Sequence, residues 1–191
     1  LMSVVFTPVG VRDILHLPLN ELTNRYVSLE EALGREGKDM EEQMMNLAGF
    51  NERVDSLETF LLGRLQRRNE FENNRMRMVM TRLLQCRGMF NVEQLAGYAC
   101  LSRKQFERVF AAYVGLMPKQ YLRVIRFLYA VEFRNRMPEV DLATLAFHTG
   151  YYDAAHLANE IKALTGHTSS TLFQLMCFSE DVESIEWFLG A

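Results

Sequence analysis

Cysteine is scarce in this chain of 191 residues, and its three copies are far apart. Cys86, Cys100 and Cys177 are odd in number and have neither the close pairs of a zinc site nor the spacing of a disulfide framework. We therefore interpret them as reduced, buried thiols of a cytoplasmic protein. A redox-sensing role is the alternative.

Long apolar runs are also missing. No stretch approaches the roughly 18 consecutive apolar residues of a transmembrane helix, so no contact with a membrane is expected. The start of the chain has no charged, apolar and small-residue succession typical of a secretion signal. Because the chain opens at Leu1 inside an apolar segment, we expect it to be a fragment of a longer protein.

Signatures of catalysis are missing as well. The sequence has no glycine-rich phosphate loop, no cysteine pair with metal spacing and no nucleophile elbow. His148 and His156 are close in sequence but fall on different predicted helices, unlike the pair four residues apart in zinc proteases. Asp153, between them, is accounted for as a helix N-cap. We expect no enzymatic activity, no metal and no cofactor.

One pattern occurs twice in the second half of the chain. Each copy predicts a short helix, a tight turn and a second helix. Leu95 and Leu145 of the first helices lie 50 residues apart, whereas Phe106 and Leu157 of the second helices lie 51 apart, so the second turn has one extra residue. A duplicated helix-turn-helix is typical of proteins that bind DNA.

The turn of each copy has suitable residues. Gly150 suits a backbone position with positive φ, and Cys100 takes its place in the first copy. Ser102 and Asp153 are favourable N-caps for the helices that follow.

The candidate base contacts lie between the inward-facing residues of each second helix. In the first copy they are Arg103, Lys104, Glu107 and Arg108, and in the second they are Ala154, Ala155, His156 and Asn159. Basic groups suit guanine edges and a glutamate suits a cytosine amine, whereas methyl groups suit thymine and an amide suits adenine. We expect the first helix to carry most of the base specificity. An ordinary solvated helix face is the alternative for its basic residues.

A long helical pattern from Pro118 to about Met137 joins the copies, with the proline in a favourable first-turn position. Twenty residues at about 1.5 Å each span roughly 30 Å, close to the ~34 Å between successive major-groove faces. One chain could thus place two recognition helices in adjacent grooves. The candidate phosphate contacts are Ser102, Lys119, Arg123, Asp153, Lys162, His167 and Thr168, and Arg126 near the start of the joining helix also suits a phosphate contact. A solvated basic face is again the alternative on that helix.

Positive charge is concentrated in the same part of the chain. The whole chain has a net charge of -3, but residues 1–71 have -4, residues 72–174 have +5 and residues 175–191 have -4. A positive segment of this kind is the electrostatic footprint of a DNA-binding region. The acidic tail also carries apolar residues such as Trp187, so it either docks against the domain or stays in solvent.

The first seventy residues predict a small α+β region. Short strands are expected over residues 4–11 and 14–18, a helical turn over 30–33, and two helices over 39–68 that meet near 49–51. An apolar stripe in these helices could seal a domain core or a dimer. It comprises Met44, Leu47, Val54, Leu57, Leu61 and Leu65.

Residues from about Phe90 to Phe173 resemble the DNA-binding domain of AraC/XylS transcription regulators, in which a long helix joins two helix-turn-helix units. The resemblance rests on Leu95, Ala96, Ser102, residues 108–110, Gly115, Pro118, Tyr121, Arg126, Ala130, Gly150, Tyr151, Asp153, His156, Leu157, Lys162 and Gly166. It implies that the base contacts fall on the eight residues given above. Asn159, Ile161 and Ser169 depart from the family, which usually has arginine, phenylalanine and proline there. The first departure implies weaker DNA contact by the second unit.

The N-terminal region is similar to the end of an uncharacterised domain found ahead of some AraC-type regulators. The similarity is carried by residues 6–10, 20–23 and 53–58 and is less specific. It implies signal sensing or dimerisation, and hence a homodimer or a small-molecule effector as partners. The family resemblance also implies contact with RNA polymerase.

The sequence therefore predicts a mainly α protein, with an all-α C-terminal domain of two helix-turn-helix units joined by a long helix. The expected domains are the sensing or dimerisation region at residues 1–70, the DNA-binding domain at 71–175 and the acidic tail at 176–191. The expected function is that of a cytoplasmic, sequence-specific transcription regulator bound to double-stranded DNA. The alternative is a helical protein-interaction module in which DNA binding is weak or lost.

Overall fold

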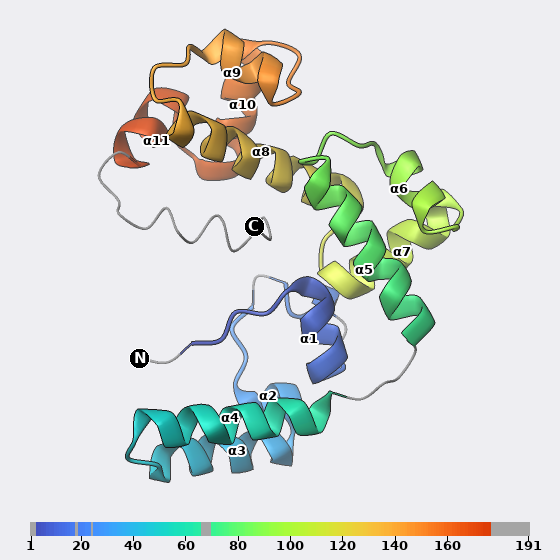
Figure 1. The fold of residues 1–191 in the computed structure, drawn as a ribbon, viewed down its shortest axis with the longest axis vertical. Helices are drawn as coiled ribbons and strands as arrows, with labels where there is room; N and C mark the ends of the chain where they lie inside the picture. Colours follow the sequence, from blue (N-terminus) through green and yellow to red (C-terminus); the bar gives the residue numbers. More distant parts are fainter. Residues whose placement is uncertain (1–2, 18, 24, 66–69, 177–191) are drawn as a thin grey trace. The chain divides into compact units, whose positions relative to one another are not determined.

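The computed structural model describes residues 3–17, 19–23, 25–65 and 70–176 (Figure 1). Over these residues the chain forms eleven α-helices and one 3-10 helix, without a β-strand. The prediction of a mainly α protein is confirmed.

The predicted N-terminal strands are wrong. The segment forms helix α1 (Pro8–Leu15), with a proline in the first turn, where its missing N–H costs nothing. The Thr7 side chain caps this helix by accepting a hydrogen bond from the Gly10 N–H at 3.1 Å. His16, in the left-handed conformation with φ 58°, ends it. The β-branched residues favoured a strand, but capping at both ends overrides that weak propensity.

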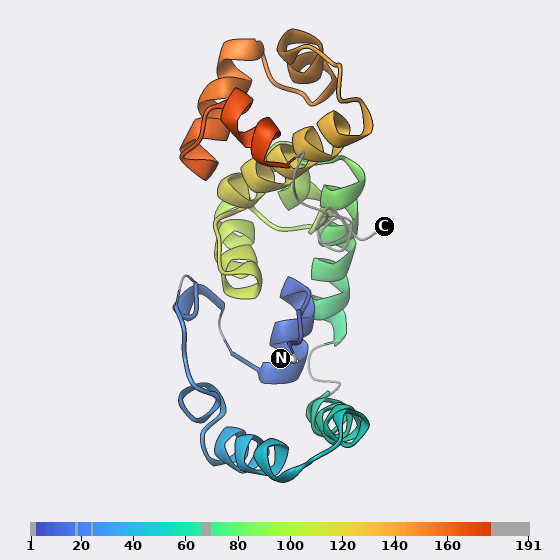
Figure 2. The same ribbon diagram turned by 90° about the vertical axis from the view of Figure 1, so that its left-hand side faces the viewer.

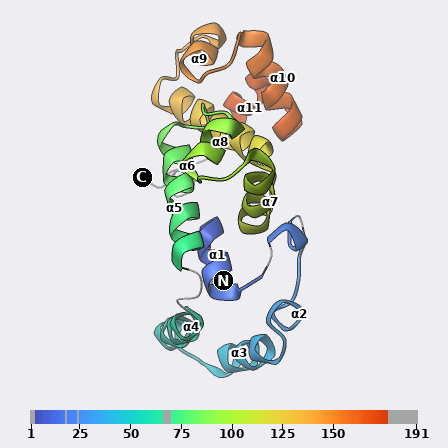
Figure 3. The ribbon, with the colours of Figure 1, turned by 90° about the vertical axis from the view of Figure 1, so that its right-hand side faces the viewer.

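The described residues form two compact units, the first of which comprises residues up to Met78 together with Lys104–Met117. Its N-terminal part contains the 3-10 helix Leu19–Glu21 and the helices α2 (Leu29–Leu33), α3 (Arg35–Asn46) and α4 (Phe50–Arg64). Helices α3 and α4 lie side by side (Figure 3) and meet at Gly49, as predicted. The predicted apolar stripe is half-buried there except for Leu65, which is exposed.

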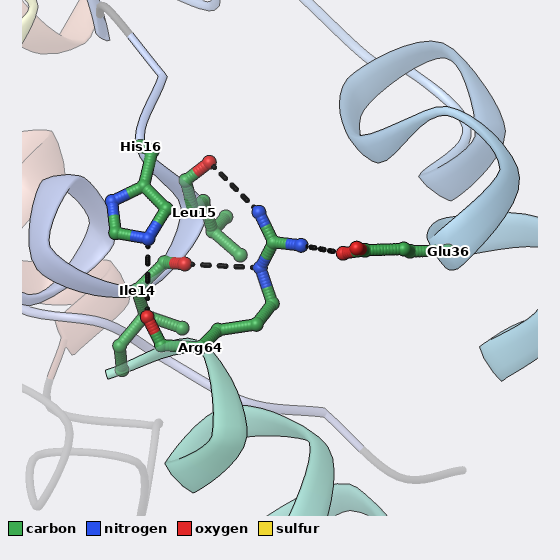
Figure 4. A network of polar contacts seen from close by, with 5 residues as sticks. All are labelled: Ile14, Leu15, His16, Glu36 and Arg64. Atoms are coloured by element: carbon green, nitrogen blue, oxygen red, sulfur yellow. Dashed lines mark hydrogen bonds and ion pairs between the residues drawn. The ribbon is translucent and has the colours of Figure 1, made fainter. Parts of the chain in front are cut away.

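Arg64 joins three elements of the N-terminal part, as Figure 4 shows. Its guanidinium donates to the carbonyl oxygens of Ile14 at 3.1 Å and Leu15 at 3.4 Å, and it pairs with Glu36. The Arg64 carbonyl in turn contacts His16 Nε2 at 3.1 Å. Since the last carbonyls of a helix have no partner within it, Arg64 satisfies the end of α1 while tying it to α3 and α4.

The second unit comprises Val79–Arg103 and the residues from Pro118 onward. It contains the end of α5 (Glu70–Gln85), α6 (Val92–Tyr98), α8 (Pro118–Arg136), α9 (Leu142–His148), α10 (Ala154–Thr165) and α11 (Ser169–Met176). Helix α8 matches the predicted long helix. Helices α9 to α11, orange to red in Figure 2, gather around the later part of α8. Their buried core comprises Ala130, Leu145, Ala146, Tyr151, Leu157 and Ile161.

Helix α7 (Arg103–Val114) falls, from Lys104 onward, in the first unit with the N-terminal helices. The boundaries of the compact units therefore differ from those of the predicted domains, residues 1–70, 71–175 and 176–191, and these domains stay predictions. Residues 177–191, with Cys177 and most of the acidic tail, lie outside the described residues.

Candidate nucleic-acid interface

The same turn follows α6 and α9. Cys100 and Gly150 have φ angles of 51° and 72°, so both occupy the left-handed region, as predicted. The next residue of each copy donates its N–H to the carbonyl of the alanine five positions earlier, at 3.0 Å for Leu101 and 2.9 Å for Tyr151. The duplicated sequence thus folds into a duplicated turn.

Helix α7, the first predicted recognition helix, buries one face and exposes another. Its inward residues Phe106, Phe110 and Tyr113 are buried. Arg103, Lys104 and Arg108 are exposed and Glu107 is half-buried, so the predicted base-contact set lies largely on the outer surface of α7. Arg103 pairs with Glu93 of α6, both in the second unit.

Helix α10, the second predicted recognition helix, is capped by Asp153, whose Oδ1 accepts the His156 N–H at 2.7 Å. Leu157 and Ile161 are fully buried on its inner face. The predicted contacts Ala155, His156 and Asn159 are exposed, and Ala154 is half-buried.

The His156 ring is oriented by its neighbours. Its Nδ1 accepts the Tyr152 N–H at 3.4 Å, and the ring stands edge-on to Tyr151 with centroids 5.4 Å apart. A neutral imidazole whose Nδ1 accepts carries its proton on Nε2. His156 can therefore offer an N–H donor to an acceptor atom of a base edge.

The predicted phosphate contacts divide into two groups. Those exposed at the surface are Ser102, Lys119, Asp153, Lys162, His167 and Thr168. Asp153 is the α10 cap, and the Thr168 hydroxyl contacts Thr171 at 2.9 Å in the first turn of α11. Arg123 pairs with Glu160, which raises the pKa of this guanidinium. Arg126 donates to the Gly88 carbonyl. The two arginines make structural contacts that sequence reasoning missed.

Two exposed aromatic residues lie near α10 and were not among the predicted contacts. Tyr152 is 91% exposed directly before the α10 cap, and Phe147 is 80% exposed on α9. The place of Tyr152 beside the predicted N-cap Asp153 was the signal available in the sequence.

Two tyrosines of the second compact unit have side-chain pKa values well above the ordinary value. Desolvation by burial raises the pKa of Tyr121 and of Tyr151 from 10.0 to about 12. Among the described residues the Tyr151 hydroxyl has no hydrogen-bond partner. A buried polar group of this kind costs free energy that a phenyl ring would not.

The raised pKa values of these two tyrosines predict that the protein is destabilised at alkaline pH. The free energy of unfolding should stay level up to pH 10 and fall between pH 10 and about 12, because the unfolded tyrosines ionise first. The slope should be about 1.4 kcal/mol per pH unit for each tyrosine. Tyr151→Phe should reduce this slope by the contribution of one tyrosine and leave neutral-pH stability equal or about 1 kcal/mol higher. Urea titrations across this pH range measure both effects, and a flat profile in wild type would contradict the assignment.

The described residues contain no group of three or more His, Cys, Asp or Glu side chains placed to hold a metal ion. In the same part of the chain, every helix is too short or too polar to cross a membrane.

Comparison with known proteins places one family on this region. Residues 95–174 match the helix-turn-helix domain family. An uncharacterised HTH-type transcriptional regulator of Haemophilus influenzae is 30% identical over 73 residues, which are 38% of this chain. The matched segment spans about a quarter of that relative's length, 24%. No solved structure matches the chain.

Proposed function

Residues 95–174 of this chain are an AraC-type helix-turn-helix domain, and from this we propose that the chain is a sequence-specific transcription regulator with two recognition helices. The domain supports DNA binding and transcription regulation at the level of the family. We further propose that α7 and α10 enter adjacent major grooves of one duplex.

The repeated unit carries the proposal. Both α7 and α10 follow the same left-handed turn and expose most of the predicted base-contact residues. Helix α8, which lies between them in the chain, has 19 residues. At about 1.5 Å per residue it is roughly 28 Å long, comparable to the ~34 Å between adjacent major-groove faces.

The two helices differ in what they can read. Lys104 and Arg108 on α7 are exposed donors, suited to guanine edges. On α10 the Ala155 methyl suits thymine and the Asn159 amide suits adenine, with His156 as a single further donor. We propose that α7 supplies most of the specificity and that its half of the site is less tolerant of base changes.

The phosphate contacts are proposed for the exposed residues at or near helix starts, chiefly Lys119 at the start of α8 and His167 before α11. Arg123 is proposed to contact a phosphate only if the duplex displaces its carboxylate partner, Glu160.

The N-terminal region is proposed to bind a small-molecule effector or to dimerise. Contacts within the first unit support its coupling to DNA binding. The Arg12 guanidinium lies 4.3 Å from the centre of the Tyr113 ring and donates to the Ala112 carbonyl at 3.4 Å. The Thr23 hydroxyl donates to the Gly115 carbonyl at 2.8 Å. The first contact holds the last turn of α7 and the second holds the residue that follows the helix, so a change in the N-terminal region would act directly on this proposed recognition helix. RNA polymerase remains a proposed partner.

The test is selection of random duplexes on the whole chain at low and moderate salt. We expect an enriched motif of about two helical turns, more constrained in the half read by α7. With four to six phosphate contacts, a fourfold rise in salt should weaken binding by about 10²- to 10³-fold. Lack of enrichment at low salt would reject the proposal and favour a helical protein-interaction module. The presence of Ala154 and Ala155 at two predicted base-contact positions of α10 supports that alternative.

A further inference from the structure

A short loop, residues 87–89, leads from α5 into the first helix-turn-helix unit. Arg87 and Gly88 both have positive φ, 54° and 74°. The turn is closed by hydrogen bonds from the Gly88 N–H to the Leu83 carbonyl at 3.3 Å and from the Met89 N–H to the Cys86 carbonyl at 3.0 Å. We call residues 87–89 the clamp loop.

The clamp loop is held against the middle of α8. Arg126 donates twice to the Gly88 carbonyl, from Nη2 at 2.8 Å and from Nε at 3.3 Å. A Cβ on Gly88 would lie 2.6 Å from the Leu122 carbonyl oxygen and 2.8 Å from the backbone nitrogen of Arg126. Glycine is therefore required for this approach. The Arg87 guanidinium also lies 4.2 Å from the centre of the Tyr129 ring.

The clamp loop also reaches the turn of the second helix-turn-helix unit. A Cβ placed on Gly150 would lie only 3.2 Å from Met89 Cγ and 3.5 Å from its Sδ, so the methionine lies against this turn. The Arg126 guanidinium lies 5.7 Å from the centre of the ring of Tyr151, the next residue. One arginine thus contacts both the clamp loop and the second turn.

A third contact joins α10 itself to α8. Arg123 donates to Glu160 through Nε at 2.8 Å and Nη2 at 3.0 Å, a two-point geometry that resists rotation. The second helix-turn-helix unit is therefore held to α8 by Arg123 at α10 and by Met89 and Arg126 at its turn.

We propose that Met89 and Arg126 are positioning residues that lock the turn of the second helix-turn-helix unit against α8 and the clamp loop.

The lock is tested by hydrogen exchange on the full chain. The Gly150 and Tyr151 amides, bonded to the Phe147 and Ala146 carbonyls, should exchange at least tenfold faster in Met89→Ala and Arg126→Ala. Met89 is 45% exposed, so its variant should remain folded even where Arg126→Ala is not. Arg136→Ala is the matched control. Arg136 also lies on α8, but among the ion pairs of the described residues its one partner is Glu132, on the same helix. Unchanged exchange of the turn in a folded Met89→Ala would overturn the lock.

Discussion

Arg108→Ala is expected to weaken binding to the selected duplex by about 1 to 3 kcal/mol, which is roughly 5- to 150-fold in Kd. The reason is the exposed guanidinium in the second turn of α7, which can donate two hydrogen bonds to a guanine edge. The loss should be specific, so a second selection on the variant should show relaxed base preference at one position within the α7 half-site.

The control for Arg108→Ala is Lys38→Ala, which also removes one exposed positive charge but lies on α3 in the N-terminal part. Fluorescence anisotropy at fixed salt should give the same Kd for this control as for wild type. Equal weakening of both variants, or an unchanged base preference in Arg108→Ala, would show that Arg108 contributes only general charge.

Leu157→Ala is expected to lower the free energy of unfolding by about 2 to 5 kcal/mol. Leu157 is fully buried on α10 in the core shared with Leu145 and Ile161, and its truncation leaves a cavity that these side chains can only partly fill. Because the core positions α10, the variant should also lose preference for the second half-site more than for the first.

Denaturant unfolding of the whole chain measures this loss. Leu175→Ala on α11 is the matched control, because its side chain is more than half exposed and its truncation should change stability by less than about 0.5 kcal/mol. If Leu157→Ala were as stable as this control, the core around α10 would not have the packing described.

The elements that could be predicted have local causes. Helix α8 starts at Pro118, whose ring suits a first turn, and the turn before α10 needs Gly150 for its positive φ. Asp153 caps α10 with its own side chain. Each of these preferences acts within a few residues, so the pattern of the chain was sufficient to locate them.

The prediction of strands near the N-terminus was wrong because two local preferences compete in this segment. The valines at positions 4, 5, 9 and 11 favour a strand, whereas Thr7 and Pro8 favour a helix start. The latter prevail in a segment whose helix is also tied by Arg64 to α3 and α4. That tie spans some fifty residues of sequence and has no counterpart in local periodicity.

The sequence by itself determined the duplicated unit, its turns, the Asp153 cap of α10, the long helix between the copies and most of the residues that face outward on α7 and α10, since all of these follow from helical periodicity and local backbone preference. Only the tertiary structure decided what the arginines of α8 do. Arg123 binds Glu160 and Arg126 binds Gly88 because α10 and the clamp loop, distant in sequence, lie beside α8. A basic residue on a helix face looks the same in sequence whether its partner is a phosphate or a neighbouring carbonyl, and only the packing of the chain distinguishes the two.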